Sequence, residues 1–356
     1  MKKTIAVLLA VVMLTALLAG CSGNNGGSTN APSGEPKGKV NVYNWGEYID
    51  SDLLKEFQDE TGIEVVYREY QTNEQMYSVL STGGASYDVI IPSDYMASRL
   101  ISEDMLEKID FANVPNIELI DESFKGMEYD PTGEYTVPYM WGTVGIIYDP
   151  AVTGGEIDSW EALFNPDYSG QVLMFDNSRD AFGIALKYLG YSLNTTDAAA
   201  LDAAQELLVQ QKPMLQAYVM DEIFDKLESG EAAIGPYYAG DYLSMLENNP
   251  DLEFVVPKEG SNIFVDLMCI PKGAENKANA EAFINFMCKT EVSLRNSEMI
   301  GYTSPNVEVE DQIELDDFAR EIMYPSEELL SRCEFFVNLP EDTLNSYNDR
   351  WVSLKS

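Results

Sequence analysis

The 356-residue chain has no histidine, and this absence narrows the chemistry open to it. Serine and cysteine hydrolases that use a histidine base are excluded, and so are metal sites built on imidazole. A hydrolase that works with two carboxylates, such as a glycoside hydrolase, is compatible with the composition and stays as an alternative. The sequence itself predicts no catalytic residue, no metal ligand and no cofactor.

Cysteine is almost as scarce, with four in the whole chain. Besides Cys21 there are Cys269, Cys288 and Cys333, and none of them has the CxxC spacing of zinc or redox motifs. Cys269 lies in an apolar run typical of a strand and Cys288 in one typical of a helix, so buried free thiols are expected. One disulfide among these three residues stays open.

Basic residues are few as well, because 22 Lys and Arg stand against 60 Asp and Glu, for a net charge of −38. Such a surface repels nucleic acid and anionic lipid and favours cationic ligands. We therefore expect no nucleic-acid partner. A solvated acidic surface without any bound ligand is the ordinary alternative.

The N-terminus has an apolar run over residues 4–18 that is too short to span a membrane and follows two lysines. This pattern is typical of a secretory signal peptide, which we place at residues 1–20. The end of this segment, Leu-Ala-Gly-Cys, resembles the bacterial lipobox, whose cysteine becomes lipidated; here that residue is Cys21. Residues 21–38 would then be the lipidated cysteine and a flexible tether rich in Ser, Gly and Asn. The expected location is outside the cytoplasm, lipid-anchored to the cell membrane at the cell surface or in the periplasm.

From Lys39 onward, apolar runs typical of strands alternate with helical segments, for which Ser51 and Asn73 are the expected N-caps. This order predicts an α/β fold with mainly parallel sheets flanked by helices, and the length favours two domains. We expect two lobes joined by hinge strands near residues 138–148 and 264–270. Lobe 1 would comprise residues 39–142 plus 267–308, and lobe 2 residues 143–266 plus 309–356.

Several predicted strands end in aromatic, hydroxyl or acidic residues. In open α/β sheets, ligands bind outside the carboxyl ends of the strands. Trp45, Glu47 and Tyr48 follow the first strand, and aromatic faces beside a carboxylate suit an organic cation. The alternative is that Trp45 and Tyr48 only cap a core. Similar strand ends deliver Ser93, Tyr95, Asn177, Asp180 and Tyr238.

Asp266 is the strongest candidate among the carboxylates for a functional role, because it interrupts the apolar run Phe264 to Ile270. A lone charge in a buried strand is costly unless it is paired. A structural aspartate satisfied by its neighbours is the alternative. For Asp180, the alternative is an acid favoured by the dipole at a helix N-terminus.

Six short motifs recur in order along the chain. They are Tyr-Asn-Trp-x-Glu-Tyr at 43–48, Pro-Ser-x-Tyr at 92–95, Val-Pro-Tyr-x-Trp-Gly at 137–142, Leu-Gly-Tyr-Ser-x-Asn-Thr-Thr-Asp at 189–197, Pro-Lys-Glu-Gly at 257–260 and Ile-Gly-Tyr-x-x-Pro-Asn at 300–306. Together they resemble the spermidine/putrescine-binding proteins of bacterial polyamine ABC transporters, strongly over residues 39–306 and weakly in the tail.

The resemblance implies a two-lobed periplasmic-binding-protein-like fold and a monomeric receptor, not an enzyme. Such a receptor would bind spermidine or putrescine and deliver it to the permease subunits of an ABC transporter. The implied ligand-binding residues are Trp45, Glu47, Tyr48, Ser93, Tyr95, Asn177, Asp180, Tyr238, Phe264, Asp266 and Tyr302.

This chain departs from the family pattern at several of these positions. Asn177 stands where spermidine binders often have a second acid, and Asp180 where they have Glu. Tyr238 and Phe264 replace tryptophans, which weakens each cation–π contact, and a late family Gln falls near Phe336. Recognition of a third amine is therefore in question, and the shorter diamine putrescine stays open.

Physical chemistry supports the same class of ligand. Ammonium groups with a lysine-like pKa are charged at neutral pH, so an acid must meet each one on binding, and the methylene stem needs flat apolar walls. A ferric-ion or other small-cation binder of the same fold is the alternative, because Tyr237-Tyr238 is similar to the adjacent tyrosines of ferric-ion binders.

Overall fold

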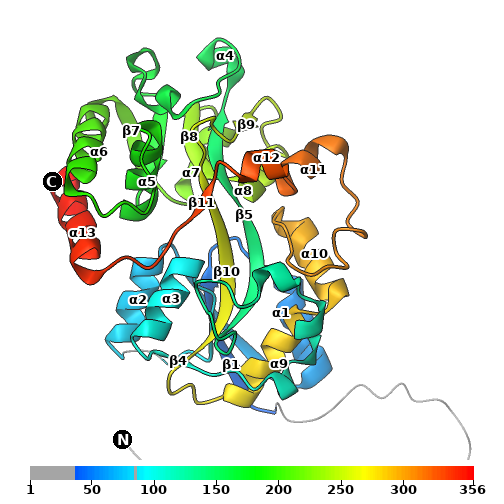
Figure 1. The fold of residues 1–356 in the computed structure, drawn as a ribbon. Coiled ribbons are helices and arrows are strands. Elements are labelled where there is room, and N and C mark those ends of the chain that lie inside the picture. The colour runs from blue at the N-terminus through cyan, green and yellow to red at the C-terminus, as the bar shows by residue number, and fades with distance from the viewer. Residues whose placement is uncertain (1–36, 84–85) are drawn as a thin grey trace, which may run out of the picture. The chain divides into compact units, whose positions relative to one another are not determined.

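Two long antiparallel strands, β5 (Thr136–Tyr148) and β10 (Asn262–Pro271), run through the middle of the molecule (Figure 1). The computed structural model describes residues 37–83 and 86–356. The expected signal peptide, Cys21 and nearly all of the expected tether lie outside the described residues. The two strands contain both segments expected as hinges, and their register shifts between Asp266 and Leu267.

The strands of the described chain form one sheet in the order β2-β1-β3-β10-β5-β8-β6-β7. On the β10 side, β1 (Lys39–Trp45) pairs in parallel with β2 (Glu64–Tyr70) and β3 (Val89–Ile90). We call this part, with α1 (Ser51–Thr61), α2 (Asn73–Ser81) and α3 (Asp94–Ser102), the first lobe. The caps of α1 and α2 are Asp50 and Thr72, one residue before the expected ones.

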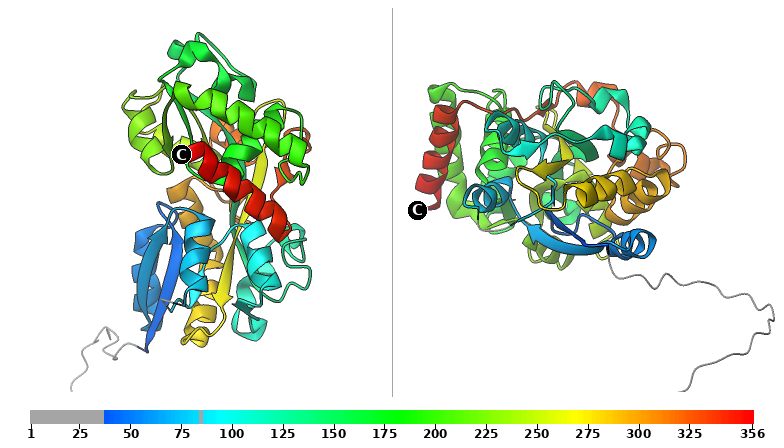
Figure 2. Two further views of the ribbon diagram at one scale, coloured as in Figure 1. Left: turned by 90° about the vertical axis from the view of Figure 1, so that its left-hand side faces the viewer. Right: turned by 90° about the horizontal axis from the view of Figure 1, so that it is seen from below.

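The second lobe lies on the β5 side. Here β6 (Val172–Phe175) pairs in parallel with β7 (Leu215–Val219) and β8 (Ile234–Tyr238), and β8 pairs antiparallel with β5. Its helices are α5 (Ser178–Tyr188), α6 (Ala198–Gln211), α7 (Glu222–Glu228) and α8 (Ala239–Met245). The C-terminal helix α13 (Glu341–Lys355), red in Figures 1 and 2, packs on α5 and α6.

The remaining elements cover these lobes and connect them. The α-helices are α4 (Pro150–Thr153), α9 (Lys277–Met287), α10 (Thr290–Ile300), α11 (Asp317–Met323) and α12 (Glu327–Leu330). The short strands are β4 (Leu106–Glu107), β9 (Glu253–Val255) and β11 (Glu334–Phe335). Short 3-10 helices span Phe111–Asn113, Pro115–Leu119, Glu122–Phe124, Trp160–Phe164, Pro166–Tyr168 and Lys212–Met214.

This architecture confirms the predicted α/β fold, with two parallel β–α lobes joined by antiparallel crossover strands. Cys269, Cys288 and Cys333 are all free, and the first two are buried, so no disulfide forms among the three. Burial raises the pKa of Cys288 to about 12, which keeps it a neutral thiol. In the described part of the chain, no helix is both long and apolar enough to cross a membrane.

Candidate functional site

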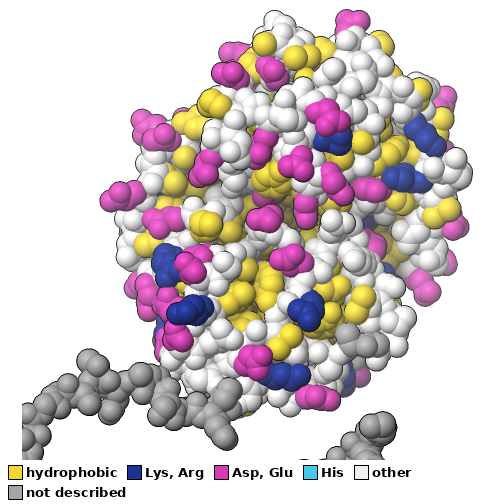
Figure 3. All heavy atoms as spheres, turned by 180° about the vertical axis from the view of Figure 1, so that it is seen from behind, with side chains coloured by type: hydrophobic (Ala, Val, Ile, Leu, Met, Phe, Trp, Pro, Cys, Tyr) yellow, Lys and Arg dark blue, Asp and Glu magenta, His cyan; other side chains and the backbone are white. Residues whose placement is uncertain are grey.

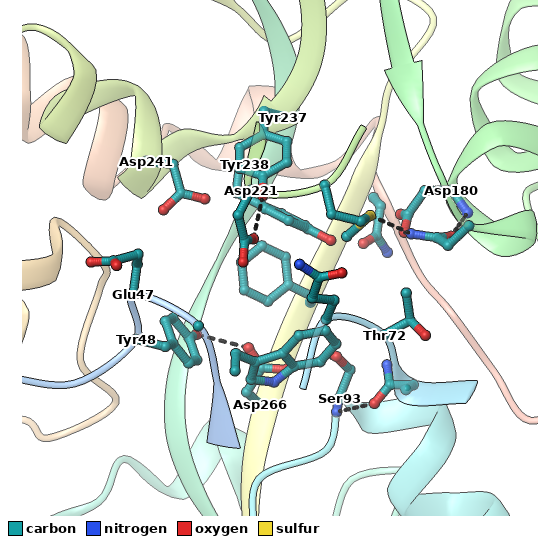
Figure 4. A pocket seen from close by; sticks show the side chains of 18 of the residues that line it. Glu47, Tyr48, Thr72, Ser93, Asp180, Asp221, Tyr237, Tyr238, Asp241 and Asp266 are labelled. Atoms are coloured by element: carbon teal, nitrogen blue, oxygen red, sulfur yellow. Dashed lines mark hydrogen bonds between the residues drawn. The ribbon is translucent and has the colours of Figure 1, made fainter. Parts of the chain in front are cut away.

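One pocket gathers the side chains of both lobes and of β10 (Figure 4). All residues expected to bind the ligand line it, namely Trp45, Glu47, Tyr48, Ser93, Tyr95, Asn177, Asp180, Tyr238, Phe264, Asp266 and Tyr302. They come together because β1, β3, β6 and β8 all end at this pocket. Among the described lining residues there are several carboxylates but neither Lys nor Arg.

Asp266 lies in the middle of the pocket on β10 and is 4% exposed. Its Oδ2 accepts a hydrogen bond from the Tyr48 hydroxyl at 2.7 Å, and its Oδ1 accepts one from the Ser93 hydroxyl at 2.7 Å. Burial raises the pKa of Asp266 to about 7, although both hydroxyl donors oppose this shift. The carboxyl is thus held in place by two lobe-1 hydroxyls, while no basic side chain of the described residues pairs with it.

Three acids, Glu47, Asp221 and Asp241, lie at one end of the pocket (Figure 4). Asp241 accepts a hydrogen bond from the Tyr302 hydroxyl at 2.7 Å, and Asp221 accepts one from the Tyr237 hydroxyl at 3.1 Å. Burial raises the pKa of Asp241 to about 8, and the charges of Asp221 and Glu47 add to this shift. The three carboxyls are therefore close enough to repel one another. We call them the three-acid end.

The turn after β1 carries Glu47 and lies next to Asp221, and its backbone allows both. Glu47 has a φ of 49°, which is rare for a residue other than glycine. At Gly46, an added Cβ would lie 2.7 Å from Oδ2 of Asp221, so a side chain there would collide with the second lobe. A residue without a Cβ thus lets Asp221 approach the β1–α1 turn.

Asp180 lies on the opposite side of the pocket from Glu47 and Asp241 (Figure 4). Asn177 is the N-cap of α5; its Oδ1 accepts from the Asp180 backbone N–H at 2.8 Å, and its Nδ2 donates to Oδ2 of Asp180 at 2.6 Å. Burial raises the pKa of Asp180 to about 6; the charge of Glu74 adds to the rise, while Asn177 and Arg179 oppose it. The expected alternative role of Asp180 at a helix N-terminus is thus real, and the side chain still lines the pocket. We call this region the Asp180 end.

Aromatic rings form walls between these ends. The Tyr238 and Phe264 rings lie 5.3 Å apart at 76°, and those of Tyr48 and Tyr302 lie 4.8 Å apart at 82°. Trp45 donates from its indole nitrogen to the Ile91 carbonyl at 2.8 Å. Tyr48 and Trp45 also pack against the core, so the alternative of a core cap describes part of what they do.

Sequence reasoning missed several lining residues. Asp241 lies three residues after Tyr238, within the first turn of α8, and Asp221 follows the end of β7. The rule on strand ends did not reach Asp221, because the sequence analysis predicted no strand at β7. Phe336 also lines the pocket, where its ring lies 5.8 Å from that of Tyr95.

Comparison with known proteins places this geometry in context. The model of the family described as bacterial extracellular solute-binding protein matches residues 52–321. The spermidine/putrescine-binding periplasmic protein of Salmonella typhimurium is 34% identical over 316 residues, which are 88% of this chain and 90% of that protein. The putrescine-binding periplasmic protein SpuD of Pseudomonas aeruginosa is 32% identical over 340 residues, or 89% of this chain and 92% of SpuD.

Solved structures of similar proteins have the same fold. A putative spermidine/putrescine ABC transporter protein from Listeria monocytogenes superposes with a TM-score of 0.86 at 38% identity, covering 89% of this chain and 98% of that one. The substrate-binding protein PotD of a spermidine/putrescine ABC transporter from Streptococcus pneumoniae, solved with calcium and HEPES, gives a TM-score of 0.75 at 36% identity over 90% of this chain and 99% of that one.

Proposed function

The chain belongs to the bacterial extracellular solute-binding proteins, and from this premise we propose that it is a receptor for polyamines, spermidine or putrescine, that delivers them to an ABC transporter. The names of its relatives support this ligand class. The pocket supports it independently, by its chemistry.

The observation that carries the proposal is an aromatic-walled pocket with carboxyls at both ends and in the middle but no basic side chain among its described lining residues. Ammonium groups of a polyamine are charged at neutral pH and lose hydration on entering a closed site. Asp266, the three-acid end and Asp180 each offer a carboxyl to such a group. The aromatic rings between them provide the faces that methylene groups and cations prefer.

The acidic surface fits this ligand class as well. On the face opposite that of Figure 1, Asp and Glu side chains are more frequent than Lys and Arg, and several lie near the middle of that face (Figure 3). A negative potential of this kind raises the encounter rate with cationic solutes and weakens as salt is added.

For the arrangement of the receptor at the membrane, our proposal adopts the expectations from the sequence. The signal peptide 1–20 would direct export, and lipidated Cys21 with the tether 21–38 would hold the domain at the membrane. Lobe 1 (39–142 plus 267–308) and lobe 2 (143–266 plus 309–356) would close on the ligand by a hinge motion at β5 and β10. A monomer is the state in which we expect the receptor to present this closed form to the permease.

Calorimetric titration with putrescine, cadaverine, spermidine, spermine and ferric ion tests the proposal. We expect saturable 1:1 binding of spermidine or putrescine and none of ferric ion. If only ferric ion gives binding heat, and a visible tyrosinate–iron band appears, the ligand is a metal ion and the polyamine proposal is wrong. Glycoside turnover that is abolished by Asp266→Asn would instead establish a carboxylate-pair hydrolase.

A further inference from the structure

The Asp180 end contains a second acid, Glu74, which comes from the first lobe. Glu74 lies in the first turn of α2 and lines the same pocket as Asp180, and its charge raises the pKa of Asp180. Thr72, the N-cap of α2, lies on the same side of the pocket as Asp180 (Figure 4). Glu74 also borders a small cavity together with Ser178 and Arg179, the first residues of α5. The N-terminal turns of α2 and α5 therefore bring one carboxyl from each lobe to this end.

An acid in the first turn of a helix is commonly explained by the helix dipole, but the capping of α2 is complete without Glu74. Oγ1 of Thr72 accepts a hydrogen bond from the Gln75 backbone N–H at 3.1 Å, and Oε1 of Gln75 accepts one from the Gln71 backbone N–H at 2.9 Å. Oε1 of Glu74 instead accepts from the hydroxyl of Tyr95, another lining residue, at 3.1 Å. Oε2 of Glu74 accepts no hydrogen bond from the described residues, so it is available to a ligand.

A buried arginine makes this second acid important for the charge of the Asp180 end. Arg179 is 2% exposed, and it has no ion-pair partner within 4.0 Å in the part of the chain that the structure describes. Its charge opposes the rise in the pKa of Asp180 and so offsets much of this carboxylate. The other basic side chains in the small cavities beside this end are paired with acids of their own at 2.8 Å, Arg99 with Glu103 and Lys187 with Glu334. Glu74 therefore gives this end a net charge of about −1, which one ammonium group would balance.

We propose that Glu74 and Asp180 together bind one terminal ammonium group of a triamine, and that Glu74 thereby determines a preference for spermidine over putrescine. This inference rests on the proposed polyamine function and deepens it by naming a residue that selects among polyamines. The other two amines of spermidine have Asp266 and the three-acid end as partners. Putrescine has only two amines, and we expect it to use these last two sites, because no arginine offsets their charge among the described lining residues.

Calorimetry on the full chain and on Glu74→Gln, with spermidine and putrescine, tests the inference. The substitution should weaken spermidine about tenfold, because one ammonium group loses one of its two carboxylates at a partly buried site. Putrescine should weaken by only about twofold, so the ratio of the two affinities changes about fivefold. Asp52→Asn is the matched control, because it removes an exposed first-turn acid of α1, in the same lobe but outside the pocket. It should change both affinities by less than about twofold.

A rescue experiment separates a binding role of Glu74 from a structural one. Nδ2 of Asn177 lies 2.6 Å from Oδ2 of Asp180, so Asn177→Asp places a new carboxylate at this end from the other lobe, and Asp also caps helices well. In the Glu74→Gln background it should return spermidine to within about threefold of the wild-type affinity, which it would not do if Glu74 only supported the fold.

The outcomes distinguish this inference from the function on which it rests. If wild-type protein binds spermidine, the inference alone is overturned by any of three results: no loss of spermidine affinity in Glu74→Gln, equal losses for spermidine and putrescine, or a spermidine loss that Asn177→Asp does not rescue. If the wild-type protein binds no polyamine, the proposed function is wrong and the inference falls with it.

Discussion

The two lobes contribute different chemistry to the pocket. The first lobe brings rings and hydroxyls together with three acids, and its contributions are Trp45, Tyr48, Ser93, Tyr95, Glu47, Glu74 and Asp94. The second lobe brings Asp180, Asp221 and Asp241, each at the end of a strand or in the first turn of a helix. Asp266 lies on the crossover strand β10 and takes its hydrogen bonds from the first lobe. Both lobes therefore offer carboxyls to the ligand, and the first lobe differs in also supplying the two hydroxyls that hold Asp266.

Among changes that probe this comparison, the largest effect is expected from Asp266→Asn. The substitution keeps the volume but removes the charge that would pair with a desolvated amine, a loss of about 2–5 kcal/mol, or roughly 30-fold or more in affinity. Calorimetry with spermidine and putrescine measures it. Ser93→Ala, which removes one hydroxyl donor and leaves the carboxylate, is the matched control and should cost much less. Wild-type affinity in Asp266→Asn would show that the central carboxyl does not contact the ligand.

Asp241→Asn probes the charges that the second lobe contributes. We expect a weakening of about tenfold, less than for Asp266→Asn, because Glu47 and Asp221 remain nearby to receive the same ammonium group. Asp180→Asn is the comparison at the opposite end, and the smaller loss should be found there because Asn177 already donates to this carboxylate and Glu74 remains nearby to receive the same ammonium group. A larger loss for Asp180→Asn than for Asp241→Asn would reverse the assignment of the two ends.

Trp45→Leu tests the role of the first lobe as a wall for the stem. Loss of one aromatic face against a cationic ligand costs about 1 kcal/mol, or roughly fivefold in affinity. The loss should be similar for putrescine and spermidine, since a wall does not measure ligand length. Thermal unfolding of the free variant separates binding from packing, because Trp45 also contacts the core. A loss confined to spermidine would assign Trp45 to one amine instead of the stem.

How far the sequence predicts this site can be judged residue by residue. Trp45, Ser93, Asp180 and Tyr238 were identifiable because carboxyl ends of parallel strands meet at one edge of a sheet. Asp266 was identifiable because a charge inside an apolar strand is costly unless a partner or ligand pairs with it. These are local signals, and they suffice to select residues that come together in three dimensions.

The residues that were missed depend on contacts between distant segments. Phe336 lies beside Tyr95 in the pocket, although the sequence keeps these two rings far apart. Asp221 approaches the β1–α1 turn only across the two lobes. The predicted N-caps were wrong for a local reason. Asp50-Ser51 and Thr72-Asn73 each contain two good capping residues, and packing decides which of the two caps the helix.

The smallest expected effect is on the pH dependence of the ligand-free protein. Burial raises the pKa of Asp266 to about 7 and that of Asp241 to about 8, well above the value of about 3.9 for an unfolded Asp. Between about pH 4 and pH 8 the folded state then binds more protons than the unfolded state, so the free energy of unfolding falls as pH rises. The protonated carboxyls of Asp266 and Asp241 contribute their full share to the free energy of unfolding below about pH 4. This contribution is lost as the pH rises through about 7 and 8, where the two groups ionise in the folded state.

Thermal unfolding at pH 5 and at pH 8 measures this slope, and exposed carboxylates contribute little to it because they are already ionised at pH 5. We expect a lower melting temperature at pH 8 for the free protein, a smaller decrease in Asp241→Asn, and a smaller decrease when spermidine is bound, since an ammonium group stabilises the ionised carboxyls. Spermidine binding at pH 7 should also release protons, which titrations in buffers of different ionisation enthalpy detect. Equal melting temperatures at both pH values, with no proton release, would mean that these acids are already ionised in the free pocket and that the ligand is not what neutralises their charge.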